Sequence, residues 1–336
     1  MARGAIAAIL FVLASAFSAQ AQTPDAFYKG RSVSIVMGTG PGGSYDLYAR
    51  LIANHFGRHL PGNPSFTVEH MPGAGGAIAA NNLFGVAPQD GSKVLLAHSL
   101  PLIERLQPSN IRFKSTEFQW LGAYDQISQV LAIWHTQPGR NVAELKGGNI
   151  VLGAMGRNHL TYQWATLLKD SLGAPFKIVT GYTTGGALNI AMEKGEIAGW
   201  PAAWENLSGR NAHWLRDKLV HIPVVFTLKR MRELPDVPTL SEITTGEARE
   251  IAEFLASGTV HARALAVGPK VPADRVEALR KGFDAMVADK AFLAEAEKLQ
   301  LAIEPRSAKE TLDLAAKIVN ASPQFIDKVK KAVGAE

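Results

Sequence analysis

Short, mostly apolar runs alternate with amphipathic segments along the first third of the chain. Ser32 to Met37 predicts a buried strand. A glycine-rich turn separates it from Tyr45 to Phe56, where Leu47, Leu51 and Ile52 recur at helical spacing. This order of strand, turn and helix is repeated further on and predicts an α/β fold with a mostly parallel sheet.

The same order restarts in the middle of the chain, where strands are predicted at Ile150 to Ala154 and Phe176 to Thr180. Between the two halves, Trp120 to Trp134 is predicted to be a long extended crossing, and residues near 255–262 provide the return crossing. The expected fold is α/β, with two Rossmann-like lobes joined by two crossing strands, and such lobes can hinge closed on a ligand. The predicted organisation is a signal peptide at 1–21, a discontinuous first lobe at 22–125 plus 258–336, and a second lobe at 126–257.

The beginning of the chain has the layout of a secretory signal peptide. A positive start at Arg3 precedes the apolar run Ala5 to Phe17, and Ala19-Gln20-Ala21 is a small-residue cleavage signal. The apolar run is short for a membrane span. The chain contains no cysteine, which excludes disulfides, a thiol nucleophile and a lipid anchor at the cleavage site. We therefore expect a soluble periplasmic protein.

The charge pattern limits the classes of partner. The formal net charge is +5, and the lysines and arginines are scattered instead of clustered. Scattered charge does not form the basic patch that nucleic-acid binding needs, so no nucleic-acid partner is expected. A mildly basic surface can steer small anions towards the protein, although ordinary solubility explains it equally.

The first glycine-rich turn, 38–44, has the spacing of a dinucleotide fingerprint. Gly38, Gly40 and Gly43 read G-x-G-x-x-G between a strand and a helix, and Glu69 ends the next strand. An exported dinucleotide-dependent oxidoreductase is therefore one alternative, but Pro41 removes a backbone donor from the turn that would hold the pyrophosphate. The favoured interpretation is that amide groups at the helix start hold a carboxylate of a small organic anion.

Two turns of the second lobe, 153–159 and 181–186, also follow predicted strands and open predicted helices. Ligands of open α/β sheets bind beyond the carboxyl ends of the strands, so these turns are the expected pocket walls. Arg157 is predicted to grip a carboxylate in a bidentate fork, with a solvated arginine as the alternative. Tyr182 and Trp200 provide either flat walls or part of the core. A further turn, 72–76, is expected to pack beneath the first one.

Several chemistries lack their residues in this sequence. His55 and His59 have the i, i+4 spacing of zinc ligands, but Phe56 stands where a metalloprotease carries its glutamate, so we expect surface histidines. Neither a G-x-S-x-G nucleophile elbow nor a P-loop occurs. The inventory is that of a binding protein, with no catalytic residue, no cofactor and no metal expected.

Six short motifs occur in the order and spacing of a known family. They are Pro41-Gly42-Gly43-Ser44-Tyr45-Asp46, Met71-Pro72-Gly73-Ala74-Gly75-Gly76, Ala87-Pro88-Gln89-Asp90-Gly91, Gly185-Gly186-Ala187-Leu188, Gly195-Glu196-Ile197 and Leu234-Pro235-Asp236-Val237-Pro238-Thr239. Through them the chain resembles the extracytoplasmic solute receptors of tripartite tricarboxylate transporters, the Bug or TctC-like family. The resemblance implies a monomer with a type II periplasmic binding fold that closes like a clamshell. It also implies partners: a small organic anion, and the large and small membrane subunits of a transporter.

Carried over by position, the resemblance implies ligand contacts from both lobes. Ser44 and Tyr45 depart from the common pattern of the first turn, and Met155 departs from that of a second-lobe turn. The identity of the ligand therefore stays open among dicarboxylates, tricarboxylates, aromatic acids and amino-acid-like anions. A sensory receptor that presents its ligand to a membrane kinase would use the same pocket and is a further alternative. The implied contacts are Thr39, Pro41, Gly42, Gly43, Ser44 and Ser99 from the first lobe, and Gly156, Arg157, Asn158, Tyr182, Thr183 and Thr184 from the second.

Overall fold

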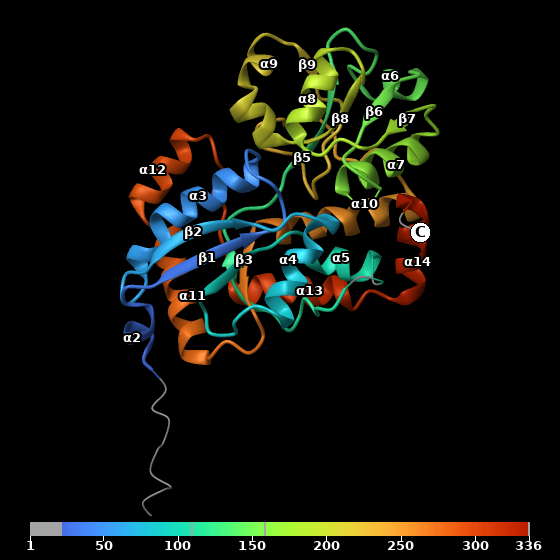
Figure 1. Cartoon of the computed structure of the whole chain (residues 1–336). Helices are drawn as coiled ribbons and strands as arrows, with labels where there is room; N and C mark the ends of the chain where they lie inside the picture. The colour runs from blue at the N-terminus through green and yellow to red at the C-terminus, as the bar shows by residue number, and fades with distance from the viewer. Residues whose placement is uncertain (1–21, 108, 110, 158, 335–336) are drawn as a thin grey trace, which may run out of the picture.

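The computed structural model describes residues 22–107, 109, 111–157 and 159–334. The predicted signal peptide at 1–21 and the predicted ligand residue Asn158 lie outside these described residues. Figure 1 shows two α/β lobes, with helix α10 (Gly246–Thr259) where they meet. In the described part of the chain, no helix combines the length and the apolar character that a membrane crossing needs.

The first lobe is built on a six-stranded sheet that mixes both ends of the chain. The strand order is β11-β4-β10-β3-β1-β2. β1 pairs in parallel with β2 and β3, whereas β10 and β11 pair antiparallel with their neighbours. The expectation of a mostly parallel sheet is therefore wrong, because the late strands return from the other lobe and run against the early ones. The strands are β1 (Ser32–Met37), β2 (Ser65–His70), β3 (Lys93–Leu96), β4 (Gln119–Ala123), β10 (Ala264–Val267) and β11 (Arg306–Ser307).

The second lobe is built on a five-stranded sheet in the order β7-β6-β8-β5-β9. β6 pairs in parallel with β7 and β8, and β5 pairs antiparallel with β8 and β9, so this sheet is also mixed. The strands are β5 (Gln129–Trp134), β6 (Val151–Gly153), β7 (Lys177–Val179), β8 (Gly199–Ala203) and β9 (Val220–His221).

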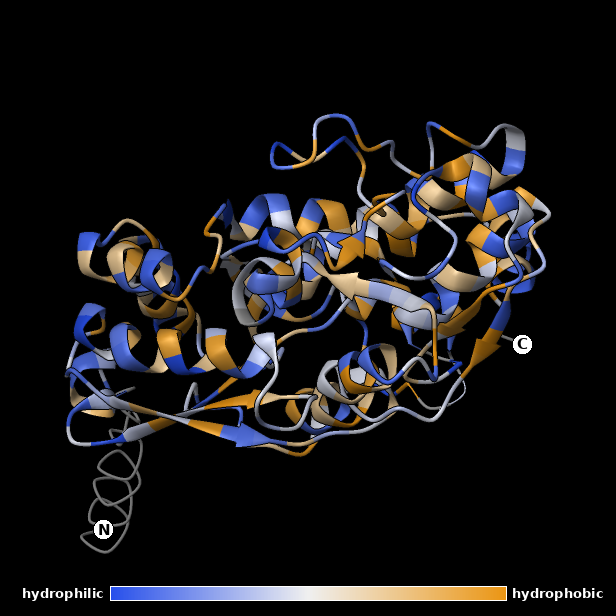
Figure 2. Ribbon diagram, turned by 90° about the horizontal axis from the view of Figure 1, so that it is seen from above, coloured by the Kyte–Doolittle hydropathy of each residue, from blue (hydrophilic) through white to orange (hydrophobic). Residues whose placement is uncertain are grey.

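Helices cover both faces of each sheet because alternate strand residues point to opposite sides. In β1, Ile35 enters one apolar cluster and Val36 another, and in β5, Leu131 and Ala132 divide in the same way. Figure 2 shows helices with apolar residues on one side and polar residues on the other. The remaining helices are α2 (Pro24–Tyr28), α3 (Ser44–Phe56), α4 (Ala77–Gly85), α5 (Leu100–Leu106), α6 (Val142–Gly147), α7 (Leu160–Leu172), α8 (Gly185–Glu193), α9 (Ala212–Arg216), α11 (Ala273–Val287), α12 (Lys290–Lys298), α13 (Ala308–Val319) and α14 (Pro323–Val333).

The two connections between the sheets differ in kind. The predicted extended crossing at 120–134 is present as two strands, β4 in the first sheet and β5 in the second, with 124–128 between them. The return runs through α10 and a 3-10 turn at 260–263 before β10. The second predicted crossing strand is therefore a helix, because Ile251, Ala252 and Leu255 recur at helical spacing and are buried together.

The last helix lies away from the first sheet. α14 packs against α7 of the second lobe, and it also contacts α5 and α10. Ile326 and Val329 join the same apolar cluster as Trp164 of α7. The C-terminal segment thus spans both lobes (Figure 1).

Candidate functional site

Strand order brings remote parts of the chain to one edge of the first sheet. β1 and β3 run parallel with Met37 opposite Leu96, so the turns that follow them start at the same edge. β10 runs antiparallel to β3, and its amino end, preceded by Arg263, reaches that edge as well. The amide of Tyr124, just beyond β4, donates to the Arg263 carbonyl oxygen at 2.9 Å. The first glycine turn and Arg263 therefore belong to the same edge.

The first glycine turn, 38–44, opens α3 with no side-chain cap at its N-cap residue Gly43. The carboxylate of Asp46 instead accepts hydrogen bonds from the amide of Gly42 (3.0 Å) and from Nε of Arg50 (3.1 Å). Burial opposes ionisation, but these hydrogen bonds hold the pKa of Asp46 below its ordinary value. Asp46 therefore stays charged and fixes the shape of the turn.

Two more turns pack directly beneath the first. A Cβ atom on Gly38 would lie 2.4 Å from the Cα atom of Gly76, and one on Gly76 would lie 2.8 Å from the ring of His98. Only glycines allow this approach, and Gly76 also has a φ of +100°. The Tyr45 ring stacks on His98 with centroids 4.3 Å apart. The prediction that the turn at 72–76 packs under the first turn is confirmed.

The second-lobe turns follow β6, β7 and β8, whose parallel pairing places their carboxyl ends at one edge. His159 and Thr184 are the N-caps of α7 and α8, and the Thr184 hydroxyl accepts from the amide of Ala187 at 3.1 Å. Trp200 is buried in the core and donates to Oδ1 of Asn189 at 3.2 Å. Of the two readings offered for Trp200, the core position is the one observed.

Arg263 is the most unusual side chain at the first edge, because it is a fully buried cation (0 % exposed). Its guanidinium lies over the rings of Tyr45 and Tyr48, at 4.8 and 4.3 Å from their centroids. Nη2 donates to the hydroxyl of Ser44 at 3.2 Å. Nε and Nη1 are buried and make no hydrogen bond of good geometry with the described residues, although the Tyr124 hydroxyl interacts with the guanidinium. A buried arginine with unmade hydrogen bonds requires an explanation.

The second lobe contributes the countercharge. Glu205 lies two residues after β8, is the N-cap of the π-helical turn Asn206–Arg210 and is 8 % exposed. Its Oε2 atom lies 3.4 Å from Nη2 of Arg263. Burial works against the charged guanidinium, but Glu205 and three tyrosine hydroxyls hold the pKa of Arg263 above its ordinary value. The ion pair therefore joins the edges of the two sheets.

Three other titratable groups surround this pair. Burial, with the nearby charges of His159 and Arg263, lowers the pKa of His98 to about 3. Burial also lowers the pKa of His159 to about 4. Burial and the charge of Glu205 raise the pKa of Asp125 to about 7. At neutral pH both imidazoles are uncharged, so Arg263 carries the positive charge of this group.

The structure places the predicted ligand residues at these two edges. Thr39 and Ser99 have buried hydroxyls without a hydrogen-bond partner among the described residues, and Ser44 contacts Arg263. Arg157 is exposed, and its guanidinium lies 5.9 Å from the ring centroid of Tyr162. The other residues occupy the same turns: Pro41, Gly42 and Gly43 after β1, Gly156 after β6, and Tyr182, Thr183 and Thr184 after β7. Their contact with a ligand stays a prediction.

Sequence reasoning missed Arg263, Glu205 and Tyr45. The available signal was positional: Arg263 directly precedes the apolar run Ala264–Val267, and Glu205 follows the buried strand β8. A charged residue at the end of a buried strand lies at the sheet edge where ligands bind.

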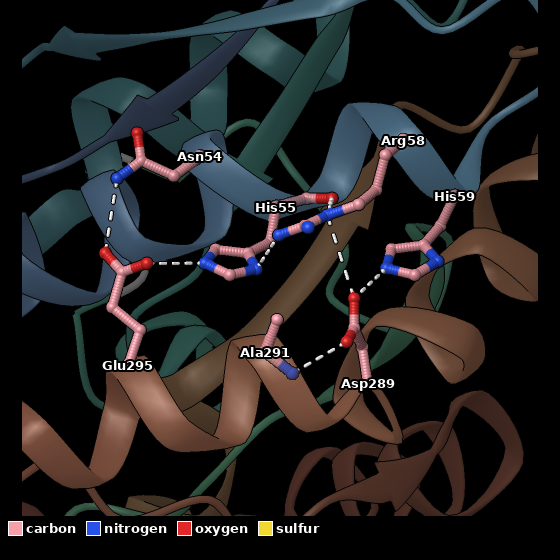
Figure 3. Close-up of polar contacts among 7 residues, drawn as sticks. All are labelled: Asn54, His55, Arg58, His59, Asp289, Ala291 and Glu295. Atoms are coloured by element: carbon pink, nitrogen blue, oxygen red, sulfur yellow. Dashed lines mark hydrogen bonds and ion pairs between the residues drawn. The ribbon is translucent and has the colours of Figure 1, made fainter.

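His55 of α3 and His59 of the 3-10 turn that follows it are not the surface residues that we expected. Figure 3 shows His55 and His59 directed towards α12. His55 is 4 % exposed and donates from Nε2 to Glu295 at 2.6 Å, while its Nδ1 accepts from Arg58. His59 lies 2.9 Å from Asp289. These pairs join α3 to α12, and the described residues contain no group of three or more potential metal ligands.

One ion pair bears on the dinucleotide alternative. Glu69, the acid that a dinucleotide site would use to hold a ribose, forms an ion pair with Lys93.

Two surface hollows lie away from the Arg263–Glu205 pair. One is at α4 and is lined by residues that include Ala77 and Asn81, and the other lies between α2 and α11.

Comparison with solved structures identifies the fold class of the chain. The two lobes match the solved structure of the periplasmic binding protein BugD, with a TM-score of 0.72 and 21% sequence identity, over 92% of this chain and 99% of that one. They also match MatC of Rhodopseudomonas palustris, solved with malate (TM-score 0.66, 19% identity, 90% and 99% covered). A third match, from R. palustris with adipate, has a TM-score of 0.69 at 18% identity, over 91% and 98% of the two chains. The fold is therefore that of the type II periplasmic binding proteins.

Comparison with sequence relatives gives a weaker but consistent result. No family model matches the chain. A UPF0065 protein of Agrobacterium vitis is 27% identical over 230 residues, which span 66% of this chain and 64% of that protein. A UPF0065 protein of Bordetella bronchiseptica is 22% identical over 253 residues, 74% and 72% of the two chains. The predicted resemblance is confirmed: the chain is a relative of the UPF0065 (Bug/TctC) proteins.

Proposed function

We propose that this chain is a periplasmic solute-binding protein that captures a small organic carboxylate between its two lobes. The observation that carries the proposal is the gathering of buried, unsatisfied donors at one edge of the first sheet, where Glu205 of the second lobe meets Arg263. Nε and Nη1 of Arg263 and the hydroxyls of Thr39 and Ser99 all lack hydrogen bonds of good geometry among the described residues. Donors gathered in this way match the oxygen atoms of a carboxylate.

The comparisons support the same function. Solved structures of this fold include proteins with bound malate and adipate, both small carboxylates. Among the structural matches named above, BugD is a periplasmic binding protein. We propose that the predicted residues of both lobes, Arg157 among them, approach the ligand when the lobes close, and that the lobes divide near 125/126 and 257/258.

The partner and the location are part of the proposal. BugD is a periplasmic binding protein, and we assign this chain to the periplasm after removal of residues 1–21. The ligand would then be delivered, by a monomer, to the large and small membrane subunits of a tripartite tricarboxylate-type transporter. A sensor partner would use the same pocket. The dinucleotide enzyme is disfavoured, because Pro41 interrupts the turn and Glu69 is paired with Lys93.

Ligand binding tests this function directly. The purified chain is titrated with organic acids and amino acids while its thermal unfolding is followed. A true ligand at about a hundred times its Kd stabilises the folded state by about 2.7 kcal/mol through mass action. Saturable binding of at least one acid is the expected result. Absence of binding across the whole panel, or a tightly held nicotinamide or flavin nucleotide, contradicts the proposal.

A further inference from the structure

Three buried ionisable side chains meet where the two lobes join, and each comes from a different part of the chain. Asp125 lies in the connection 124–128 between β4 and β5, Glu205 follows the second sheet, and Arg263 ends the return connection. Asp125 is as deeply buried as the other two, at 2 % exposed. Because water screens buried charges poorly, the number of protons on this group affects how the lobes hold together.

Tyr48 of α3 shows where a proton is needed. Its hydroxyl lies 2.9 Å from Oδ2 of Asp125 and 2.9 Å from the carbonyl oxygen of Ala302. A phenol has one proton to donate, and a carbonyl can only accept. Both contacts are hydrogen bonds when Asp125 is protonated, since its carboxyl donates to Tyr48 and Tyr48 donates to Ala302. If Asp125 is ionised, one of the two contacts loses its proton.

The charges of the group favour the same proton. With Asp125 ionised, two carboxylates share the single guanidinium of Arg263, whereas with Asp125 protonated the ion pair of Arg263 and Glu205 is neutral. The remaining neighbours do not change charge between pH 5 and pH 8. Burial keeps the imidazoles neutral by lowering their pKa values and keeps the phenols neutral by raising theirs, and Arg306 stays charged and donates to Gln126 at 3.2 Å. These neighbours are His98, His159, Tyr45, Tyr48, Tyr124 and Arg306.

Glu205 is the least firmly held of the three charged side chains. The carboxyl of Asp125 accepts from the amide of Gln126 as well as contacting Tyr48. Arg263 lies over two tyrosine rings and donates to Ser44. Oε2 of Glu205, in contrast, has only the ion pair at 3.4 Å and no hydrogen bond among the described residues. Repulsion between the two carboxylates is therefore relieved most easily by movement of Glu205 with its lobe.

We propose that Arg263 and Glu205 form a latch between the lobes, and that a proton on Asp125 keeps this latch closed. Loss of the proton leaves Asp125 competing with Glu205 for the guanidinium, so Glu205 separates and the lobes open. Opening thus releases one proton. The inference uses the lobe movement of the proposed function, but it concerns the protein without a ligand.

Small-angle X-ray scattering of the ligand-free protein between pH 5 and pH 8 tests the latch. Burial and the charge of Glu205 raise the pKa of Asp125 from 3.8 to about 7, and separation from Glu205 lowers it again. The open form therefore binds fewer protons, and the ratio of open to closed molecules is expected to rise by up to about tenfold per pH unit until about pH 7 and then to level off.

The expected result is a radius of gyration that increases with pH over this range. A radius that stays constant or decreases overturns the latch. Saturable binding of an organic acid by the same preparation would then leave the solute-binding function intact, so the two failures can be told apart.

Two variants identify the residues of the latch. Asp125→Asn has no charge, and its amide can donate to Tyr48 as the protonated acid does, so the radius is expected to keep its pH 5 value up to pH 8. Glu205→Gln removes the anion of the latch, so the open form is expected at pH 5 as well. If either variant keeps the full pH response of the unaltered protein, the inference is wrong.

A matched control separates the latch from a general effect of removing a carboxylate. Asp284 of α11 also has a pKa raised by burial, but its charged neighbour is Glu277 of the same helix. Asp284→Asn is therefore expected to keep the whole change in radius with pH. If this variant loses the response as completely as Asp125→Asn does, the response does not come from the latch and the inference fails.

Discussion

Helix α3 carries a charged cluster at each end, and the two clusters differ in how completely their hydrogen bonds are made. At the C-terminal end, His55 pairs with Glu295 at 2.6 Å and His59 with Asp289 at 2.9 Å (Figure 3). The hydrogen bond from His55 holds the pKa of Glu295 below its ordinary value. At the N-terminal end, the guanidinium of Arg263 is more deeply buried, yet two of its nitrogens make no hydrogen bond of good geometry with the described residues.

The difference separates a cluster that stabilises the fold from one that is consistent with the proposed ligand site. The histidine pairs join two helices of one lobe, and all four side chains have partners. A satisfied cluster of this kind rigidifies the structure. The Arg263–Glu205 pair joins two sheets and leaves buried donors and an acceptor without hydrogen bonds among the described residues.

The largest effect on stability is expected from Arg263→Met. This change leaves the carboxylate of Glu205 buried without a countercharge, which is expected to lower the free energy of unfolding by about 3–5 kcal/mol. Denaturant unfolding of the purified variant measures the change. Adding Glu205→Gln removes the unpaired charge and is expected to restore part of the loss. A double variant that is no more stable than Arg263→Met would show that the pair is not coupled.

A smaller effect is expected at the opposite end of the helix. His55→Ala removes a buried hydrogen bond and is expected to lower the free energy of unfolding by about 1–3 kcal/mol. Because this cluster is satisfied and joins helices of one lobe, ligand affinity should remain that of the unaltered protein. A loss of affinity in His55→Ala would contradict the division of roles between the two ends of α3.

The smallest effect at neutral pH is expected from His98→Phe. The phenyl ring can keep the stacking on Tyr45, so stability near pH 7.5 should change by less than about 1.5 kcal/mol. The contribution of His98 is fully present above its unfolded pKa, about 6.5, and is lost as pH falls towards about 3, because burial with the charges of His159 and Arg263 depresses the folded pKa.

The pH dependence provides the measurement for this variant. The urea midpoint of the unaltered protein should fall more steeply between pH 6.5 and pH 4 than that of His98→Phe. The comparison is between the two proteins, because His159 and His261, whose pKa values burial lowers to about 4, titrate in both. Parallel profiles would show that the folded state does not hold the pKa of His98 below its ordinary value.

Local patterns predicted the elements well, and contacts between distant residues decided the rest. The apolar run Ser32 to Met37 coincides with β1, and the family motifs led to the correct fold. The prediction of a strand at the return crossing was wrong, although the helical spacing of Ile251 and Leu255 is present in the sequence.

The site was only half predictable for the same reason. Its first turn has a local signature, but the burial of Arg263 depends on residues such as Ser44, 219 positions away in the chain. The partners of the α3 histidines lie on α12, about as remote in sequence. The spacing of residues within one helix shows which side chains share a face. The burial and the partners of these side chains depend on the packing of the whole lobe.

The position of α14 is expected to limit how the two lobes move apart. Two rigid bodies that share two flexible connections can swing about the line through them. Here the chain makes a third connection between the lobes. It passes from α13 on the first lobe through 320–322 into α14, and α14 contacts α7, α5 and α10. If the lobes hinge as proposed, we expect α14 to move against α5 or α7, so the contacts of this helix would limit the angle of opening.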